Sequence, residues 1–225
     1  MRARTTILLA LLFFGVFSGT KAQQNKDIHE GFAVQFTGSI SPYFPYSFLF
    51  HQQAPNHFSA GAIAGTYLSK TIFVGGGIEF AGSRGVHYGL ERYGQVDRQK
   101  GAYLYGTPVF FDFKANCLET RVAPFAEVRL GINSNLNKVT RTDVVNRGSN
   151  YDLNTPRNGK YYLMGAYVSL ALGVKAGCSS FGLGCNLNTV HYDEDLYYSA
   201  NTIEHQTGSR MCQTLFFRYT YTYQK

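Results

Sequence analysis

The chain has 225 residues, with 21 lysines and arginines against 14 aspartates and glutamates, which gives a formal net charge of +7 at pH 7. Charged residues make up only 16% of the chain, below the ~25% that is usual for soluble domains. Three of the basic residues lie in the first 22 positions, so the remainder carries 21 − 3 = 18 basic residues against 14 acidic ones. A net charge of +4 does not indicate a nucleic-acid-binding protein.

The first 22 residues have the features of a secretory signal peptide. Arg2 and Arg4 give a basic start, and the apolar run from Ile7 to Phe17 is shorter than the ~20 residues of a membrane-spanning helix. Small residues follow this run up to Ala22, where we predict cleavage. We therefore expect a signal peptide at 1–22 and a single domain at 23–225.

The rest of the chain alternates between apolar and other residues at every second position, which is the period of β-strands. Between 122 and 133, for example, Val128 and Leu130 alternate with Glu127 and Arg129. The second of the predicted strands is rich in alanine and glycine, and its two faces cannot be assigned. The eight predicted strands are 31–41, 58–69, 71–81, 102–115, 122–133, 161–176, 180–190 and 211–224.

The connections between these strands alternate strictly between short and long. Turns of a few residues join the second strand to the third, the fourth to the fifth and the sixth to the seventh. The long connections cover about 42–57, 82–101, 134–160 and 191–210. Transmembrane barrels have short turns at one end and long loops at the other. The chain is therefore predicted to form an all-β, eight-stranded, antiparallel, up-and-down transmembrane β-barrel.

The size of the side chains on each face indicates which face of the sheet meets lipid. The apolar face carries rings such as Phe36, Phe111 and Phe217, and eight strands enclose too little space for all of them. We expect these rings to point outward, and Tyr219 and Tyr223 to join an aromatic girdle near the membrane interface. The other face would place a charge network in the lumen, made of Glu79, Asp112, Lys114, Glu127, Arg129, Lys175 and Arg218.

This pattern resembles the small eight-stranded outer-membrane barrels of the OmpA/OmpX-like group, and in particular the outer-membrane protein β-barrel domain family. The resemblance rests on the signal peptide and on the stretches VGGGIEF, GTPVFFDFKA, VAPFAEVRLGI and LFFRYTYTY. It implies a porin-like protein of the cell envelope that reaches the outer membrane after signal-peptide-directed secretion. The implied partners are outer-membrane lipid, lipopolysaccharide and, during insertion, the barrel-assembly machinery. We expect a monomer that binds no nucleic acid.

A lumen of eight strands is normally filled by side chains, so we expect a structural or surface-binding role, with long loops outside and polar side chains inside. No catalytic residue, cofactor or metal is expected. Three alternatives stay open: a narrow channel or transporter, a lipid-A-modifying barrel enzyme, and a soluble periplasmic or secreted barrel that carries a ligand inside. An enzyme of that kind would need a histidine, a serine and an acid near the outer rim, for which His191, Ser199 and Glu204 are the candidates.

Four cysteines remain to be placed. Cys117 and Cys178 fall in two predicted periplasmic turns, so one candidate disulfide joins them in an oxidising compartment. The alternation of the strands points Cys185 outward and Cys212 inward, which argues against a bond between those two.

Overall fold

The structure is a computed structural model, and it describes residues 30–41, 56–84, 103–146, 154–199 and 202–224. The predicted signal peptide and most of the first two long connections lie outside the described residues. Among the residues described, no helix is both long and apolar enough to cross a membrane.

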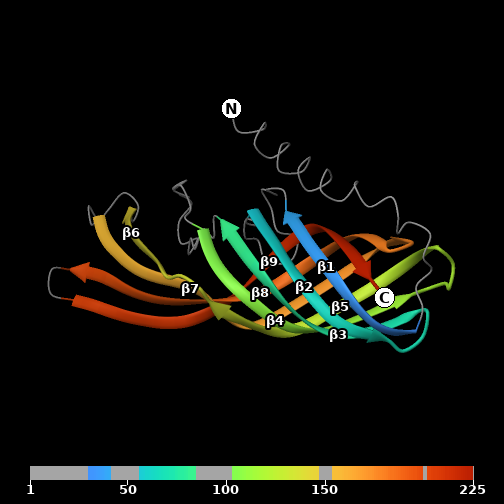
Figure 1. The fold of residues 1–225 in the computed structure, drawn as a ribbon. Coiled ribbons are helices and arrows are strands. Elements are labelled where there is room, and N and C mark those ends of the chain that lie inside the picture. Colours follow the sequence, from blue (N-terminus) through green and yellow to red (C-terminus); the bar gives the residue numbers. More distant parts are fainter. Residues whose placement is uncertain (1–29, 42–55, 85–102, 147–153, 200–201, 225) are drawn as a thin grey trace.

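The described residues form strands joined in one antiparallel sheet (Figure 1). Their order in the sheet is β5-β4-β3-β2-β1-β9-β8-β7-β6, and a further pairing of β5 with β7 closes eight of them into a barrel. The prediction of an eight-stranded antiparallel barrel is thus confirmed. The strands are β1 (Gly31–Ser41), β2 (Asn56–Tyr67), β3 (Ile72–Arg84), β4 (Tyr103–Asn116), β5 (Val122–Asn135), β6 (Val139–Asn146), β7 (Asn154–Ala176), β8 (Ser179–Ser199) and β9 (Thr202–Tyr223).

The structure differs from the prediction in two of the long connections. Most of 134–160 and 191–210 is strand, because β7, β8 and β9 continue beyond the barrel and β6 pairs with the start of β7. Figure 1 shows these strands projecting from one end of the barrel. When two strands are already paired in the barrel, each further residue pair beyond it adds backbone hydrogen bonds without the entropic cost of closing another long loop. We call β6, 154–163, 190–199 and 202–211 the extension.

A β-bulge marks the point where β7 passes from the barrel into the extension. Leu163 pairs with Val190, whereas Tyr167 pairs with Asn188, so β7 holds two more residues than β8 across this interval. Gly165 lies within the bulge with a φ of 105°, a conformation that glycine adopts without the steric cost of a Cβ.

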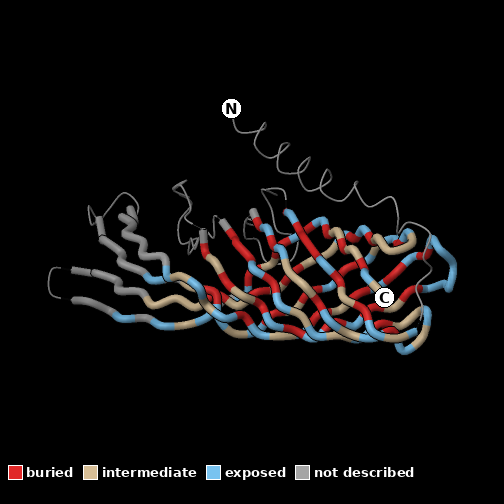
Figure 2. The backbone as a smooth tube through the Cα atoms, viewed as in Figure 1, coloured by how far each residue is buried: buried red, intermediate tan, exposed pale blue. Residues whose placement is uncertain are grey.

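Burial alternates along the barrel strands, so that one face lines the lumen and the other faces outward (Figure 2). The rings of Phe36, Phe111 and Phe217 lie on the outside, with exposed fractions of 48%, 78% and 50%. The structure also resolves the faces of β2: Ile63 is buried in the lumen, while Phe58 lies on the outer surface. The core of this protein is therefore the inside of the barrel.

Candidate functional site

The lumen holds all seven charged side chains that were predicted to face it. They come from β3, β4, β5, β7 and β9, and each of them has an exposed fraction of 5% or less. The residues are Glu79, Asp112, Lys114, Glu127, Arg129, Lys175 and Arg218.

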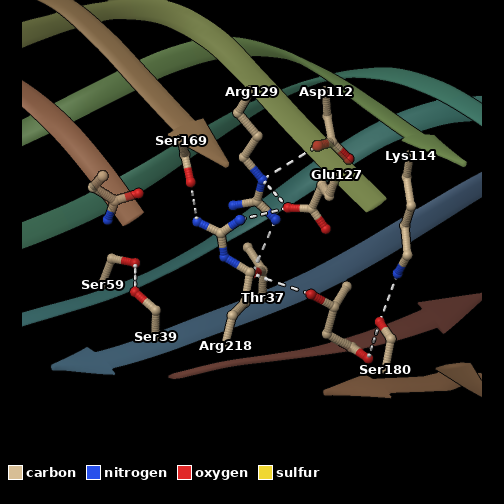
Figure 3. A network of polar contacts seen from close by, with 12 residues as sticks. Thr37, Ser39, Ser59, Asp112, Lys114, Glu127, Arg129, Ser169, Ser180 and Arg218 are labelled. Carbon is tan, nitrogen blue, oxygen red and sulfur yellow. Dashed lines mark hydrogen bonds and ion pairs between the residues drawn. The ribbon is translucent and has the colours of Figure 1, made fainter. Parts of the chain in front are cut away.

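Arg129 on β5 is the centre of the lumen network (Figure 3). Its Nε lies 2.7 Å from Glu127 Oε1 and 3.3 Å from Asp112 Oδ1. Its Nη1 pairs with Glu79, and its Nη2 donates a hydrogen bond to Thr37 Oγ1 at 3.3 Å. The antiparallel register explains the contact with Asp112, since Asp112 and Arg129 are directly opposite on β4 and β5. One guanidinium therefore links residues of β1, β3, β4 and β5.

Arg218 connects β9 to the same network. Its Nη1 lies 2.5 Å from Glu127 Oε1, and its Nη2 donates to Ser169 Oγ at 2.8 Å. The guanidinium also lies over the ring of Phe216, 4.2 Å from its centroid. Since Arg218 and Arg129 both contact Glu127 Oε1, this carboxylate joins the two arginines from different walls of the barrel.

The two lysines are placed differently from the arginines. Lys114 Nζ donates to Ser180 Oγ at 2.6 Å and lies 4.2 Å from the centroid of the Phe125 ring. Lys175 pairs in register with Ser180 on β8 and with Ala123 on β5. The structure thus joins five of the seven residues through ion pairs around the arginines, and it holds Lys114 against a hydroxyl group and an aromatic ring.

The charges of this site are close to balanced. Four cationic side chains face three carboxylates, and both guanidinium groups have several partners. Removing ions from water costs several kcal/mol each, so a buried network persists only when such contacts replace the lost hydration. Chemically, this arrangement can cross-link the barrel walls and fill the lumen.

Apolar side chains also fill the lumen, so polar residues do not fill it alone as predicted. Phe110 and Phe111 are adjacent on β4, and strand alternation requires one of them to point inward. Phe110 is that residue; it is 3% exposed and lies under Arg129, with the guanidinium 4.9 Å from its ring centroid. Two buried clusters result, one of Ala33, Ile63, Tyr67, Phe73, Phe110 and Tyr167, and one of Leu104, Leu163, Val190 and Cys212.

Uncharged polar side chains that the sequence did not single out form hydrogen bonds in the same lumen. His57 Nδ1 lies 2.9 Å from Ser83 Oγ, and Asn133 Nδ2 donates to Asn188 Oδ1 at 2.7 Å. His57 was missed because the second strand was predicted to begin at residue 58, which left His57 in the predicted connection 42–57. In the structure β2 begins at Asn56, and His57 lies on the same inward face as Ile63.

The structure does not join Cys117 to Cys178. All four cysteines lie in the described part of the chain, and no disulfide is present there. Cys117 follows β4, Cys178 lies between β7 and β8, and β5 separates β4 from β7. Two inter-strand spacings of ~4.8 Å exceed the Cα separation that a disulfide allows, which is below ~7 Å.

The candidate catalytic residues of the enzyme alternative are not brought together. His191 lies on β8 at the base of the extension, while Ser199 ends the same strand and Glu204 pairs with Leu196. Eight residues along a strand separate His191 from Ser199 by about 26 Å. Within the described ranges, no group of three or more histidine, cysteine, aspartate or glutamate residues could hold a metal ion.

Comparison with known proteins adds little to this geometry. No protein-family model matches the chain, and no curated protein matches it. Among solved structures, it is similar to the crystal structure of the N-terminal β-barrel domain of Pseudomonas aeruginosa OprF. The two share 12% sequence identity over 87% of this chain and 100% of the other, with a TM-score of 0.34. A likeness at this level does not support an assignment of family or function, so membership of the outer-membrane family remains a prediction.

Proposed function

We propose that this chain is an integral outer-membrane β-barrel protein with a structural or surface-binding role. In this proposal its lumen is closed by the charge network and its extension lies outside the cell. The observation that carries it is the composition of the outer surface of the barrel.

The described outer surface of the barrel strands carries no charged side chain. In the barrel-forming parts of the strands whose side chains are described, every lysine, arginine, aspartate and glutamate is one of the seven lumen residues. Large apolar side chains occupy the outward positions instead, as at Leu130, Leu172 and Leu183, which are 54%, 68% and 58% exposed. Water does not favour such a surface, whereas lipid does, and each lipid-facing lysine or arginine at mid-depth would cost about 2–4 kcal/mol.

Aromatic side chains lie near both ends of this apolar surface. At one end, Phe181 and Tyr219 pack with their ring centroids 5.0 Å apart. At the other end, Phe58, Phe80 and Tyr105 pack with centroids 5.6 to 6.5 Å apart. Paired girdles of this kind are typical of the two interfaces of a membrane-spanning barrel.

The height of the apolar surface also suits a bilayer. On β7 the outward side chains are apolar from Met164 to Val174, a span close to the ~9–11 residues with which a tilted strand crosses the hydrocarbon core. Closure by the β5–β7 pairing leaves no sheet edge exposed to lipid along these two strands.

The decisive experiment compares electrophoretic mobility with and without boiling, after extraction of the mature protein in mild detergent. A closed membrane barrel stays folded in the unboiled sample and migrates differently from the boiled one. We expect extraction only with detergent and a clear mobility shift. Release into the soluble fraction, together with one mobility for both samples, would contradict the proposal.

A further inference from the structure

A row of four polar side chains crosses the outer face of the sheet where the barrel meets the extension. Tyr162, His191 and Ser209 are directly opposite one another on β7, β8 and β9. Lys138, which precedes β6, reaches the same row because its Nζ lies 5.2 Å from the centroid of the Tyr162 ring. We call these four residues the Lys138 row.

The Lys138 row is partly ordered by stacking. The rings of Tyr162 and His191 are nearly parallel, with an interplanar angle of 13° and centroids 5.5 Å apart. Lys138 and Ser209 are exposed, and the two rings are half-buried. Stacking holds the two rings against each other, so the row presents polar atoms from β7, β8, β9 and the residue before β6 side by side.

The row lies directly above the apolar surface. Two residues nearer the barrel, the same outward face carries Leu136, Met164 and Met211, which are 53%, 50% and 47% exposed. Along these three segments the surface therefore changes from apolar to hydrogen-bonding side chains over two residues. On β8 the corresponding outward residue is Thr189, whose hydroxyl donates to the carbonyl oxygen of Ala166. In a barrel that spans the outer membrane, this change in the surface lies at the level of the outer lipid headgroups.

The chemistry of the row matches an anion with several oxygen acceptors. The Lys138 ammonium, the Tyr162 and Ser209 hydroxyls and a ring N–H of His191 can all donate hydrogen bonds, and the row contains no carboxylate. The next outward position on β8 is Asp193, and its Oδ1 lies 3.2 Å from Nε2 of His205, farther along the extension. Lys160 on β7 is directly opposite Asp193, so this carboxylate lies beside two basic residues that are not part of the row.

We propose that the Lys138 row binds the phosphate of an outer-leaflet lipid headgroup, as carried by lipid A. The acyl chains of that lipid would lie against Met164 and Met211 below the row. This inference rests on the proposed function, because the row meets a headgroup only if the barrel spans the outer membrane.

The test measures binding of lipid A and of dephosphorylated lipid A to the detergent-purified mature protein, using fluorescent lipid in mixed micelles. The protein is expected to prefer lipid A, and the double variant Lys138→Gln with His191→Gln to bind it about ten-fold more weakly. Lys138→Arg keeps the charge and should retain binding. The matched control is Lys70→Gln, which removes an exposed lysine that pairs with Glu119 at 3.9 Å in a turn between β2 and β3.

The outcomes distinguish failure of the phosphate site from failure of the proposed outer-membrane barrel. Equal binding of the two lipids, or an equal loss in Lys70→Gln and in the double variant, overturns the phosphate site. If the boiling-dependent mobility shift persists in every variant while lipid A preference is absent, only the further inference fails. If the unaltered protein shows no mobility shift, the membrane barrel itself fails.

Discussion

Arg218 on β9 and Glu127 on β5 meet inside the lumen with 2.5 Å between Nη1 and Oε1, although 91 residues separate them in the chain. β7 and β8 lie between their strands in the sheet, so this ion pair crosses the barrel rather than linking neighbours. Glu127 Oε1 also contacts Arg129. Replacing Glu127 and replacing Arg218 should therefore change the stability of the barrel by different amounts.

We expect Glu127→Gln to destabilise the barrel more than Arg218→Met. The first change removes the carboxylate from two buried arginines, while the second leaves Glu127 paired with Arg129. Breaking a buried pair by removing one partner costs about 3–5 kcal/mol, so Glu127→Gln should reach that range and Arg218→Met should fall below it. Urea titration of the refolded protein in vesicles measures both free energies of unfolding. Equal losses, or a larger loss for Arg218→Met, would contradict the shared role of Glu127.

The outer surface allows a sharp test of lipid contact at Leu130, an outward residue of β5 with an exposed fraction of 54%. Leu130→Arg should lower the free energy of unfolding in vesicles by about 2–4 kcal/mol, since it places a charge in hydrocarbon. Val122→Arg is the matched control, because Val122 is exposed at the first residue of the same strand, next to the turn, where an arginine costs about 0–1 kcal/mol. If Leu130→Arg had no larger effect than Val122→Arg, lipid would not contact this face.

Strand periodicity predicts much of this fold, because a two-residue period with one bulky face already specifies which residues point inward. Glu79, Asp112 and Arg129 could be placed in the lumen on that ground alone. Their contacts could not be predicted, since these depend on register: Asp112 faces Arg129 only because the turn between β4 and β5 has its particular length.

Other features lacked a signal in the sequence. Small residues are frequent on both faces of β2, so nothing distinguished inward Ile63 from outward Ala62. His57 was placed in the predicted connection 42–57, because no signal showed that the strand begins before residue 58. The sequence predicts loops where the extension lies, because polar residues stand at both odd and even positions of these segments and therefore give no two-residue hydrophobic period. The pairing of Tyr161 with Tyr192 depends on the barrel strands that continue into it.

The close packing at Gly184 predicts a steric effect inside the barrel. A Cβ at this position would lie 2.1 Å from the carbonyl oxygen of Leu170 and 2.4 Å from the ring of Phe216. Gly184→Ala should therefore destabilise the barrel by about 1–3 kcal/mol, because backbone or core must shift. At Gly76 a Cβ would meet only the Phe110 carbonyl oxygen, at 3.8 Å, so Gly76→Ala serves as the control. Similar midpoints of urea unfolding for the two variants would show that the Gly184 site can relax.

The filled lumen predicts an electrically silent barrel. Arg129, Arg218 and Glu127 meet across it, and apolar side chains such as Phe110 and Tyr167 pack around them. Planar-bilayer recordings of the purified protein should show no discrete conductance steps, with a known porin as the positive control for insertion. Reproducible steps would favour the narrow-channel alternative over a structural or surface-binding role.

The orientation of the barrel predicts which thiols a membrane-impermeant maleimide can reach. In the proposed topology Cys117 is exposed in a turn on the periplasmic side, while Lys160 is exposed in the extension outside the cell. Intact cells carrying Lys160→Cys should be labelled, since the reagent reaches the extension without crossing the membrane. Cells with the unaltered protein should stay unlabelled until the outer membrane is permeabilised, when Cys117 reacts. Labelling of the unaltered protein in intact cells, with Lys160→Cys adding nothing to it, would place the turns outside and reverse the topology.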